Sequence, residues 1–195
     1  SNTFFDRYSI SSADFPFQLI IIANLHDLIT LTEKSLSYFF LFLGSVRRIQ
    51  VSLQDLQEKY SLLTRRVEKQ LLPTCKELGV SIQAYSPLEQ GLLTGKVTMD
   101  TTYPEGSTRN SNPCFQPARR AQALKLLTGW QDLCEKYHCT PAQLVIALTA
   151  RMIPGLHVLC GARTPEQVLD NAKALTLQLD GADAVRMKWD VDAIS

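Results

Sequence analysis

The chain has 195 residues, of which 45% are hydrophobic and 20% charged, and this composition excludes an intrinsically disordered protein. A formal net charge of +1 provides no field that would attract nucleic acid or an anionic membrane. The apolar stretches 15–25 and 36–43 are shorter than the roughly 18 residues of a spanning helix, and the first residues do not resemble a signal peptide. We therefore expect a cytoplasmic protein that binds neither nucleic acid nor membrane, with one domain as the default.

The cysteines are odd in number, and none stands in a two-residue-spaced pair of the kind that builds zinc or redox sites. Reduced thiols and no metal are the expectation. Cys160 lies in an apolar run and is predicted to be buried. Cys134 and Cys139 flank the end of a predicted helix, and neither is expected to act as a nucleophile.

The character of the sequence changes near residue 45. Residues 1–45 are rich in Phe, Leu and Ile and show no clean periodicity, so the sequence predicts no particular fold for them. Residues 46–195 alternate short apolar strands with amphipathic helices, which is typical of a parallel α/β architecture. These two segments form the predicted organisation of the chain.

In the first part of the α/β region, we predict a strand at 51–57 and a helix at 65–78 that ends at Gly79, with a new turn at Pro73. A second strand follows at 80–85, where apolar and polar residues alternate. Residues 89–112 are rich in Gly, Thr, Asn, Pro and Ser, which predicts a long functional loop.

Helices dominate the remaining chain. One begins at residue 116 or 117 and carries a core stripe at helical spacing, formed by Leu126, Trp130, Leu133 and Tyr137. Thr140 and Pro141 start a helix that reaches about residue 152, and a buried strand follows at 157–161. Thr164 and Pro165 start the next helix, and Asp180 is predicted to cap the last one.

Strand–helix units with polar residues after each strand favour part of a (β/α)8 barrel of the TIM type, in which sites form at the carboxyl ends of the strands. A Rossmann fold would require a glycine-rich turn after its first strand, and the chain contains none. The first 50 residues are too short for five further units of about 30 residues each. The predicted barrel is therefore incomplete, with its C-terminal units only.

The turn after the last strand has the features of an anion site. Gly161, Ala162 and Arg163 precede the helix start, where backbone N–H groups and the helix dipole favour a phosphate. Gln167 and Asn171 lie four residues apart, so their amides share one helix face and could reach a purine together. Taken alone, a well-capped surface helix explains this turn equally well.

Three motifs together resemble the aldo-keto reductase family over about residues 50–195. The first is Tyr85-Ser86-Pro87-Leu88, continued by the glycine-leucine-rich stretch 90–96. The second is the tail from Gly161 through Gln167 to Asn171. The third consists of Gln57, Tyr60, Ser61 and Arg65.

The resemblance implies an oxidoreductase that reduces aldehydes or ketones by hydride transfer from NADPH. It implies that Tyr85 stacks on the nicotinamide and that Gln57 binds the carboxamide, whereas a core aromatic and a buried strand amide remain open alternatives. It further places Arg163 on the 2′-phosphate. The cofactor-binding residues implied by the resemblance are Gln57, Tyr85, Ser86, Pro87, Leu88, Gly91, Leu93, Gly161, Arg163, Gln167 and Asn171.

In that family a tyrosine acts as the acid beside a lysine, an aspartate and a histidine, and no matching set is found here. His26, Asp27, Lys34 and Tyr38 have suitable side chains, but their surroundings do not match the family. A non-catalytic NADPH-binding module or an inactive truncated product is therefore the alternative to an active enzyme. Self-association is expected to cover the open strand edges of an incomplete barrel.

Overall fold

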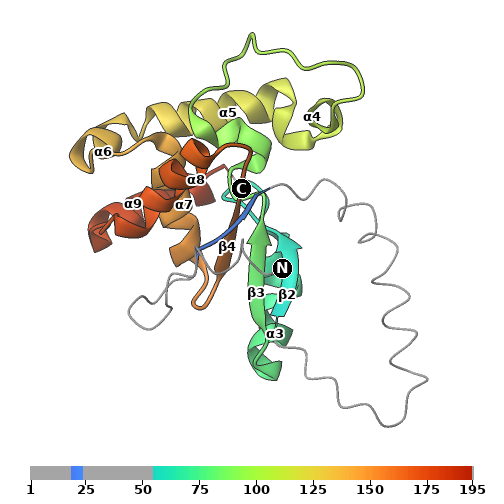
Figure 1. Ribbon diagram of the computed structural model, residues 1–195, viewed down its shortest axis with the longest axis vertical. Helices are drawn as coiled ribbons and strands as arrows, with labels where there is room; N and C mark the ends of the chain where they lie inside the picture. The colour runs from blue at the N-terminus through green and yellow to red at the C-terminus, as the bar shows by residue number, and fades with distance from the viewer. Residues whose placement is uncertain (1–18, 24–54, 195) are drawn as a thin grey trace, which may run out of the picture.

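The computed structural model describes residues 19–23 and 55–194 (Figure 1). Four strands form one sheet in the order β1-β4-β3-β2, and all three neighbouring pairs are parallel. The strands are β1 (Leu19–Ala23), β2 (Asp55–Lys59), β3 (Ser81–Tyr85) and β4 (His157–Ala162). The α/β fold with a parallel sheet was predicted, and part of a barrel fits it. Strand β1 lies in the segment for which the sequence predicted no fold.

Helices lie between β2 and β3, between β3 and β4, and after β4 along the chain. The α-helices are α2 (Arg66–Gln70), α3 (Leu72–Leu78), α4 (Thr108–Ser111), α5 (Pro117–Thr128), α6 (Gln131–Lys136), α7 (Pro141–Met152), α8 (Pro165–Ala172) and α9 (Gly181–Asp192). The 3₁₀ helices are η3 (Glu89–Thr94), η4 (Pro113–Phe115) and η5 (Lys173–Thr176).

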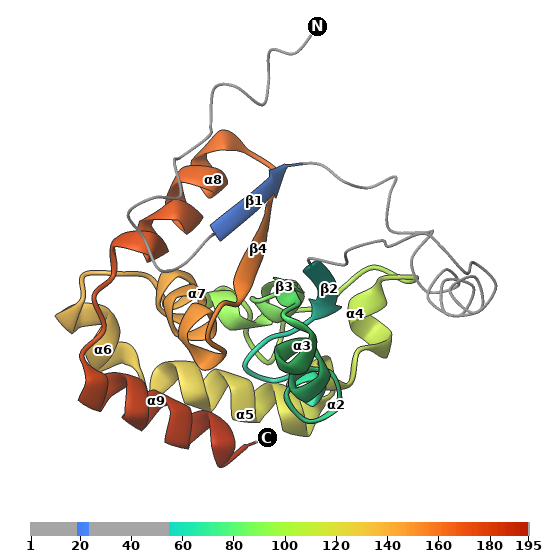
Figure 2. The same ribbon diagram turned by 90° about the horizontal axis from the view of Figure 1, so that it is seen from below.

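Strand β3 buries alternate residues, as the sequence predicted, whereas β4 buries three residues in a row. Ile82 and Ala84 of β3, with Val158 of β4, pack against Ile146 of α7 in one apolar cluster. A second cluster lies beneath η3 and joins α5, α6, α7 and α9 around the fully buried Trp130. Helices α5, α7, α8 and α9 lie on one side of the sheet, whereas α4 lies beyond β2 (Figure 2).

Several predicted element boundaries need correction. Strand β2 ends at Lys59, two residues beyond the predicted 51–57, while residues 51–54 lie outside the described part. The predicted helix 65–78 is two helices that meet at Leu71, because Pro73 supplies no N–H for a continuous helix. Its end is confirmed, since Gly79 has φ 66° and its N–H bonds back to the last turn.

The helix predicted to carry the hydrophobic stripe from Leu126 to Tyr137 is also two helices. Helix α5 ends at Thr128 and α6 begins at Gln131, although Leu126, Trp130 and Leu133 are all buried as predicted. Asp180 stands at the start of α9, but its carboxylate binds Lys136 Nζ at 2.6 Å and caps no helix N–H. The predicted N-cap position of Asp180 is therefore confirmed, but its side chain makes no capping hydrogen bond, because the carboxylate pairs with Lys136.

Thr140 and Thr164 are correctly predicted caps. The Thr140 hydroxyl accepts from the Gln143 N–H, and the Gln143 side chain accepts from the Thr140 N–H, which completes a capping box for α7. The Thr164 hydroxyl accepts from the Gln167 N–H at the start of α8. Helix α8 therefore begins directly after β4.

Candidate functional site

The carboxyl ends of β2, β3 and β4 meet at one edge of the sheet, because the three strands are parallel. Lys59, the last residue of β2, is paired with Tyr85, the last residue of β3, and Tyr85 with Leu159, three residues before the end of β4. Ligand sites of parallel α/β proteins form at this edge. The motifs around Tyr85 and Arg163 therefore lie on the same rim of neighbouring strands.

Tyr85 is not a core aromatic. Its side chain is 43% exposed, while the preceding Ala84 is fully buried on the helix-covered face. Gln57 is also exposed and lies two residues before the end of β2, opposite Gln83. Both side chains were alternatively interpreted as buried; in the described part of the chain they are exposed.

The loop after β3 has an unusual backbone. Ser86, Glu89 and Gln90 have φ of 58°, 47° and 55°, and Gly91 follows with φ 97°. Three left-handed non-glycine residues so close together are strained, and such strain is concentrated at binding and catalytic sites. Pro87 and Leu93 are buried beneath this loop, whereas Leu88 and Gly91 are partly exposed.

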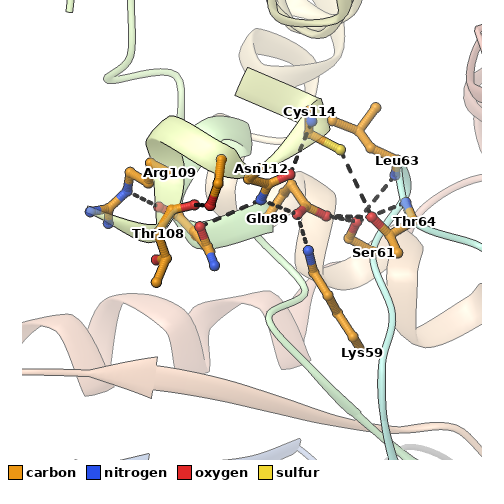
Figure 3. A network of polar contacts seen from close by, with 11 residues as sticks. Lys59, Ser61, Leu63, Thr64, Glu89, Thr108, Arg109, Asn112 and Cys114 are labelled. Atoms are coloured by element: carbon orange, nitrogen blue, oxygen red, sulfur yellow. Dashed lines mark hydrogen bonds and ion pairs between the residues drawn. The ribbon is translucent and has the colours of Figure 1, made fainter. Parts of the chain in front are cut away.

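A buried carboxylate holds the loop in this conformation (Figure 3). Glu89 is 0% exposed and accepts from Lys59 Nζ at 2.5 Å, Ser61 Oγ at 2.5 Å and Thr64 Oγ1 at 2.9 Å. Asn112 Nδ2 donates to the same carboxylate at 3.0 Å. One side chain thereby joins the end of β2, the turn after it, the loop and the segment before α5.

These bonds favour the ionised form of Glu89. Burial alone would raise the pKa of the carboxyl, but the hydrogen bonds from Asn112, Lys59 and Ser61 outweigh burial and leave the pKa below its ordinary value. A buried carboxylate with this many donors is ionised at neutral pH. Sequence reasoning missed Glu89 and Asn112, since glutamate in a polar segment is usually exposed.

A second set of contacts fixes the outer side of the loop. Arg109 Nε donates to the Gln90 carbonyl at 2.9 Å, and its guanidinium lies over the Tyr103 ring, 5.1 Å from the centroid. Arg120 donates to the carbonyls of Thr98 and Thr101. The predicted loop 89–112 is thus a structured cover that includes η3 and α4.

The turn from β4 into α8 is shaped by the predicted polar residues. The Gln167 side chain accepts from the Arg163 N–H at 2.7 Å, and Asn171 Nδ2 approaches the Gly161 carbonyl at 3.5 Å. Gln167 is exposed, whereas Asn171 is 7% exposed. Both amides therefore contact the turn itself, with Asn171 more enclosed than the sequence suggested.

The turn is open where a ligand would approach. Within the described part of the chain, and apart from the adjoining residues, nothing lies within 4 Å of a Cβ built on Gly161 or of one built on Gly91. Arg163 is exposed, and among the described residues its guanidinium has no hydrogen bond or ion pair. Open glycine backbone, an exposed arginine and a helix N-terminus fit a phosphate-containing cofactor.

Tyr60, Ser61 and Arg65 lie in the turn that follows β2. The Tyr60 hydroxyl donates to Glu68 Oε1 at 2.7 Å, and Arg65 binds the same carboxylate through Nε and NH2 at 2.7 and 2.8 Å. Arg65 also binds Asp192 at the end of α9. This network packs α2 against α9, and Tyr60 is fully buried within it.

The residues considered for the missing catalytic set, His26, Asp27, Lys34 and Tyr38, lie outside the described residues. Across 19–23 and 55–194, three or more possible metal ligands do not gather at any point. None of the helices in this portion has the length and apolar character needed to cross a membrane. Two cavities lie away from the rim, one near α6, α7 and α8 and one beside the amino end of β3.

The parallel sheet is that of an α/β protein of the barrel class, and the strand-to-helix turns at its carboxyl edge form the candidate site. The sequence model of the aldo/keto reductase family matches residues 44–188. The chain belongs to the aldo/keto reductase family. This confirms the resemblance on which the sequence interpretation rested.

Individual relatives agree with this assignment. The chain is 41% identical over 142 residues to an NADH-specific methylglyoxal reductase of Escherichia coli, covering 73% of this chain and 43% of that protein. It is 30% identical to a probable aldo-keto reductase of Glycine max, over 65% of this chain and 36% of the relative. The chain therefore spans less than half the length of these relatives.

A solved structure also matches. The glycerol dehydrogenase of Gluconobacter oxydans superposes with a TM-score of 0.63 at 28% sequence identity, covering 71% of this chain and 42% of that one. The described elements thus have the arrangement of part of an aldo/keto reductase barrel.

Proposed function

We propose that this chain forms the nicotinamide-dinucleotide-binding part of an oxidoreductase that reduces aldehydes or ketones. The observation that carries the proposal is the arrangement at the sheet edge. The exposed Tyr85 ends β3, and the open β4–α8 turn follows the next strand on the same rim. One elongated ligand with an aromatic end and a phosphate end suits this arrangement.

In this proposal Tyr85 stacks on the nicotinamide and Gln57 binds its carboxamide. The strained loop from Ser86 to Gly91 lies along the pyrophosphate, with its conformation fixed by Glu89. Gly161 gives the cofactor close access to the backbone. Gln167 and Asn171 shape the adenosine end through their contacts with the turn.

We further propose NADPH as the preferred cofactor. Arg163 is exposed beside the N-terminus of α8, where a guanidinium can bind a 2′-phosphate through two parallel hydrogen bonds. The Escherichia coli relative is named as NADH-specific, so the choice between the two cofactors requires a direct measurement.

The cofactor supplies the hydride, while the residues described here bind and orient it. The residue that donates the proton has no assigned position in this chain. A nucleotide-binding module without turnover is therefore the second candidate function. Turnover and binding must be measured separately to choose between the two.

The decisive experiment titrates the protein with NADPH and with NADH while recording the fluorescence of Trp130 and Trp189. Arg163→Ala should weaken NADPH binding by about 1.5 to 3 kcal/mol, more than tenfold, and leave NADH binding nearly unchanged. Arg66→Ala is the control, because Arg66 is exposed and, within 19–23 and 55–194, its ion pairing is limited to a 3.9 Å contact with Glu58. An unchanged NADPH affinity in Arg163→Ala would refute the phosphate position.

Turnover is then followed as the aldehyde-dependent loss of reduced-nicotinamide absorbance. Turnover supports the reductase, and binding without turnover selects the module. Failure of both cofactors to bind would reject both functions.

A further inference from the structure

The turn between α6 and α7 brings two cysteines together through its backbone. The N–H of Cys139 bonds to the carbonyl of Cys134 at 3.0 Å, and the N–H of His138 bonds to the carbonyl of Glu135 at 3.2 Å. His138 between them has φ 48°. These bonds form a Schellman motif, in which the residues at the positions of Cys134 and Cys139 pack against each other.

The packing is present here. Cys134 is 6% exposed in the apolar cluster beneath η3, and the partly buried Cys139 packs against that cluster. Each thiol also shifts the pKa of the other. The 3.0 Å backbone bond limits the two Cα atoms to less than about 7 Å, within reach of the usual disulfide span.

The pair opens onto a cleft of about 400 Å³ between α6, the start of α7 and the end of α8. Both cysteines line it, together with Glu135, His138, Asp170 and Lys173. The other described cysteines, Cys75, Cys114 and Cys160, are buried at separate places in the fold. A small oxidant in the cleft would therefore meet two adjacent thiols.

We propose that Cys134 and Cys139 form a reversible dithiol–disulfide pair that peroxide oxidises through this cleft. The sequence alone predicted no nucleophile here, and the proposal revises that expectation because the fold places the two thiols together: the sulfur of Cys139, the more exposed residue, attacks one peroxide oxygen as the thiolate. The O–O bond breaks, hydroxide leaves and takes up a proton to form water, and Cys139 becomes a sulfenic acid. The Cys134 sulfur then attacks that sulfur, the S–O bond breaks, and a second water leaves.

The balance is two thiols and one hydrogen peroxide giving one disulfide and two waters, so the thiols lose two electrons and the peroxide gains them. The reaction is slow at neutral pH. Burial first, and then the neighbouring Cys134, raise the pKa of Cys139 to about 11. The thiolate fraction, and with it the oxidation rate, should rise about tenfold per pH unit below that pKa.

The crosslink would fix the turn that starts α7. Thr140, directly after Cys139, caps α7, and Gln143 Nε2 binds the carboxylate and carbonyl of Asp170 in α8 at 2.8 and 3.0 Å. The Cys134–Cys139 turn is therefore linked, through the contact between Gln143 and Asp170, to helix α8, which begins at the open β4–α8 turn.

Trypsin provides a direct test, because Lys136 lies between the two cysteines. The reduced protein is treated with hydrogen peroxide, its remaining thiols are alkylated, and it is digested without reductant. We expect peptides 126–136 and 137–151 to remain joined, two mass units lighter than their reduced sum, and to separate with dithiothreitol. Two alkylated thiols, sulfinic acid on Cys139 alone, or a crosslink to another cysteine would overturn the proposal.

Variants test the order of the two steps. Cys134→Ser should leave a sulfenic acid on Cys139 that dimedone labels, and Cys139→Ser should be labelled far less. Cys75→Ser is the control and should form the joined peptides as the unchanged protein does. Equal labelling of both serine variants would reject Cys139 as the first sulfur to react.

Discussion

The carboxylate of Glu89 has no exposure to solvent and accepts hydrogen bonds from three segments of the chain. We expect Glu89→Gln to lower the free energy of unfolding by about 1.5 to 3 kcal/mol. The substitution removes the negative charge opposite Lys59, and the new amide NH2 group faces side chains that are themselves hydrogen-bond donors. Urea denaturation measures the change. Glu105→Gln, at an exposed position, should have almost no effect; equal losses in both variants would reject the structural role of Glu89.

The same residue predicts a dependence on pH. The pKa of Glu89 in the folded protein lies below its ordinary value of 4.5, so the folded state holds this proton less tightly than the unfolded state. Its contribution to stability is fully present above pH 4.5 and is lost as the pH falls through the folded pKa. The difference in unfolding free energy between the unchanged protein and Glu89→Gln should shrink on acidification below that pH. A difference that grew instead would contradict the sign.

Sequence motifs located the residues at the strand ends but not the residue that supports them. Tyr85 and Arg163 stand in motifs with local signals, and the structure places both on one rim. Glu89 acquires its role only when Lys59 and Asn112, far from it in sequence, come within hydrogen-bond distance. Periodicity and turn chemistry do not report such contacts, which is why the sequence left this glutamate in a loop.

At the scale of elements, helix boundaries show the same limit. The start of α7 was predictable because Thr140 and Pro141 act locally. The division between α5 and α6 was not, since Leu126, Trp130 and Leu133 keep helical spacing across it and stay buried. A hydrophobic stripe specifies which face is buried and does not require a continuous helix.

The contact between the loop and α7 can be tested at Gly95. This residue has φ 76°, and a Cβ built on it would lie 3.0 Å from Pro141 Cγ at the start of α7. Gly106 is a matched control, because its φ is 78° and a Cβ there meets no other described residue within 4 Å. Both alanine variants incur about 1 to 2 kcal/mol from the left-handed backbone.

Only Gly95→Ala also overpacks the contact with Pro141, so we expect it to lose about 1 to 3 kcal/mol more than Gly106→Ala. Thermal and urea unfolding of the two variants give the comparison. Equal losses would mean that the loop yields to the added methyl group without disturbing α7.

The joint between α2 and α9 depends on the planar guanidinium of Arg65. It binds Glu68 through two nitrogens and also reaches Asp192. Arg65→Lys keeps the charge but cannot make these contacts together, and we expect a loss of about 1 to 2 kcal/mol in unfolding free energy. Arg66→Lys, on the adjacent and exposed position, should be nearly neutral. A loss no greater than that of the control would show that charge alone suffices.

At the scale of the whole molecule, the chain contains part of a fold that is normally closed. Within the described residues the sheet has β1 and β2 at its edges, whereas a complete barrel has no edge. The face away from α7 carries Gln57, Gln83 and Tyr85, none of which is buried. An all-parallel sheet is ordinarily covered on both faces, so this face and the edge at β2, as open as the described residues leave them, are where we expect another segment or another chain to pack.

We therefore expect the chain to self-associate through β2 as its concentration rises. Sedimentation velocity over a concentration series should show a shift from monomer to a larger species. Native-state hydrogen exchange at low and high concentration locates the contact: protection should increase in Asp55–Lys59 and remain unchanged in Pro117–Thr128, because only an edge strand has backbone groups available to another chain. A monodisperse monomer throughout, or an increase confined to the α5 surface, would contradict association through the open edge.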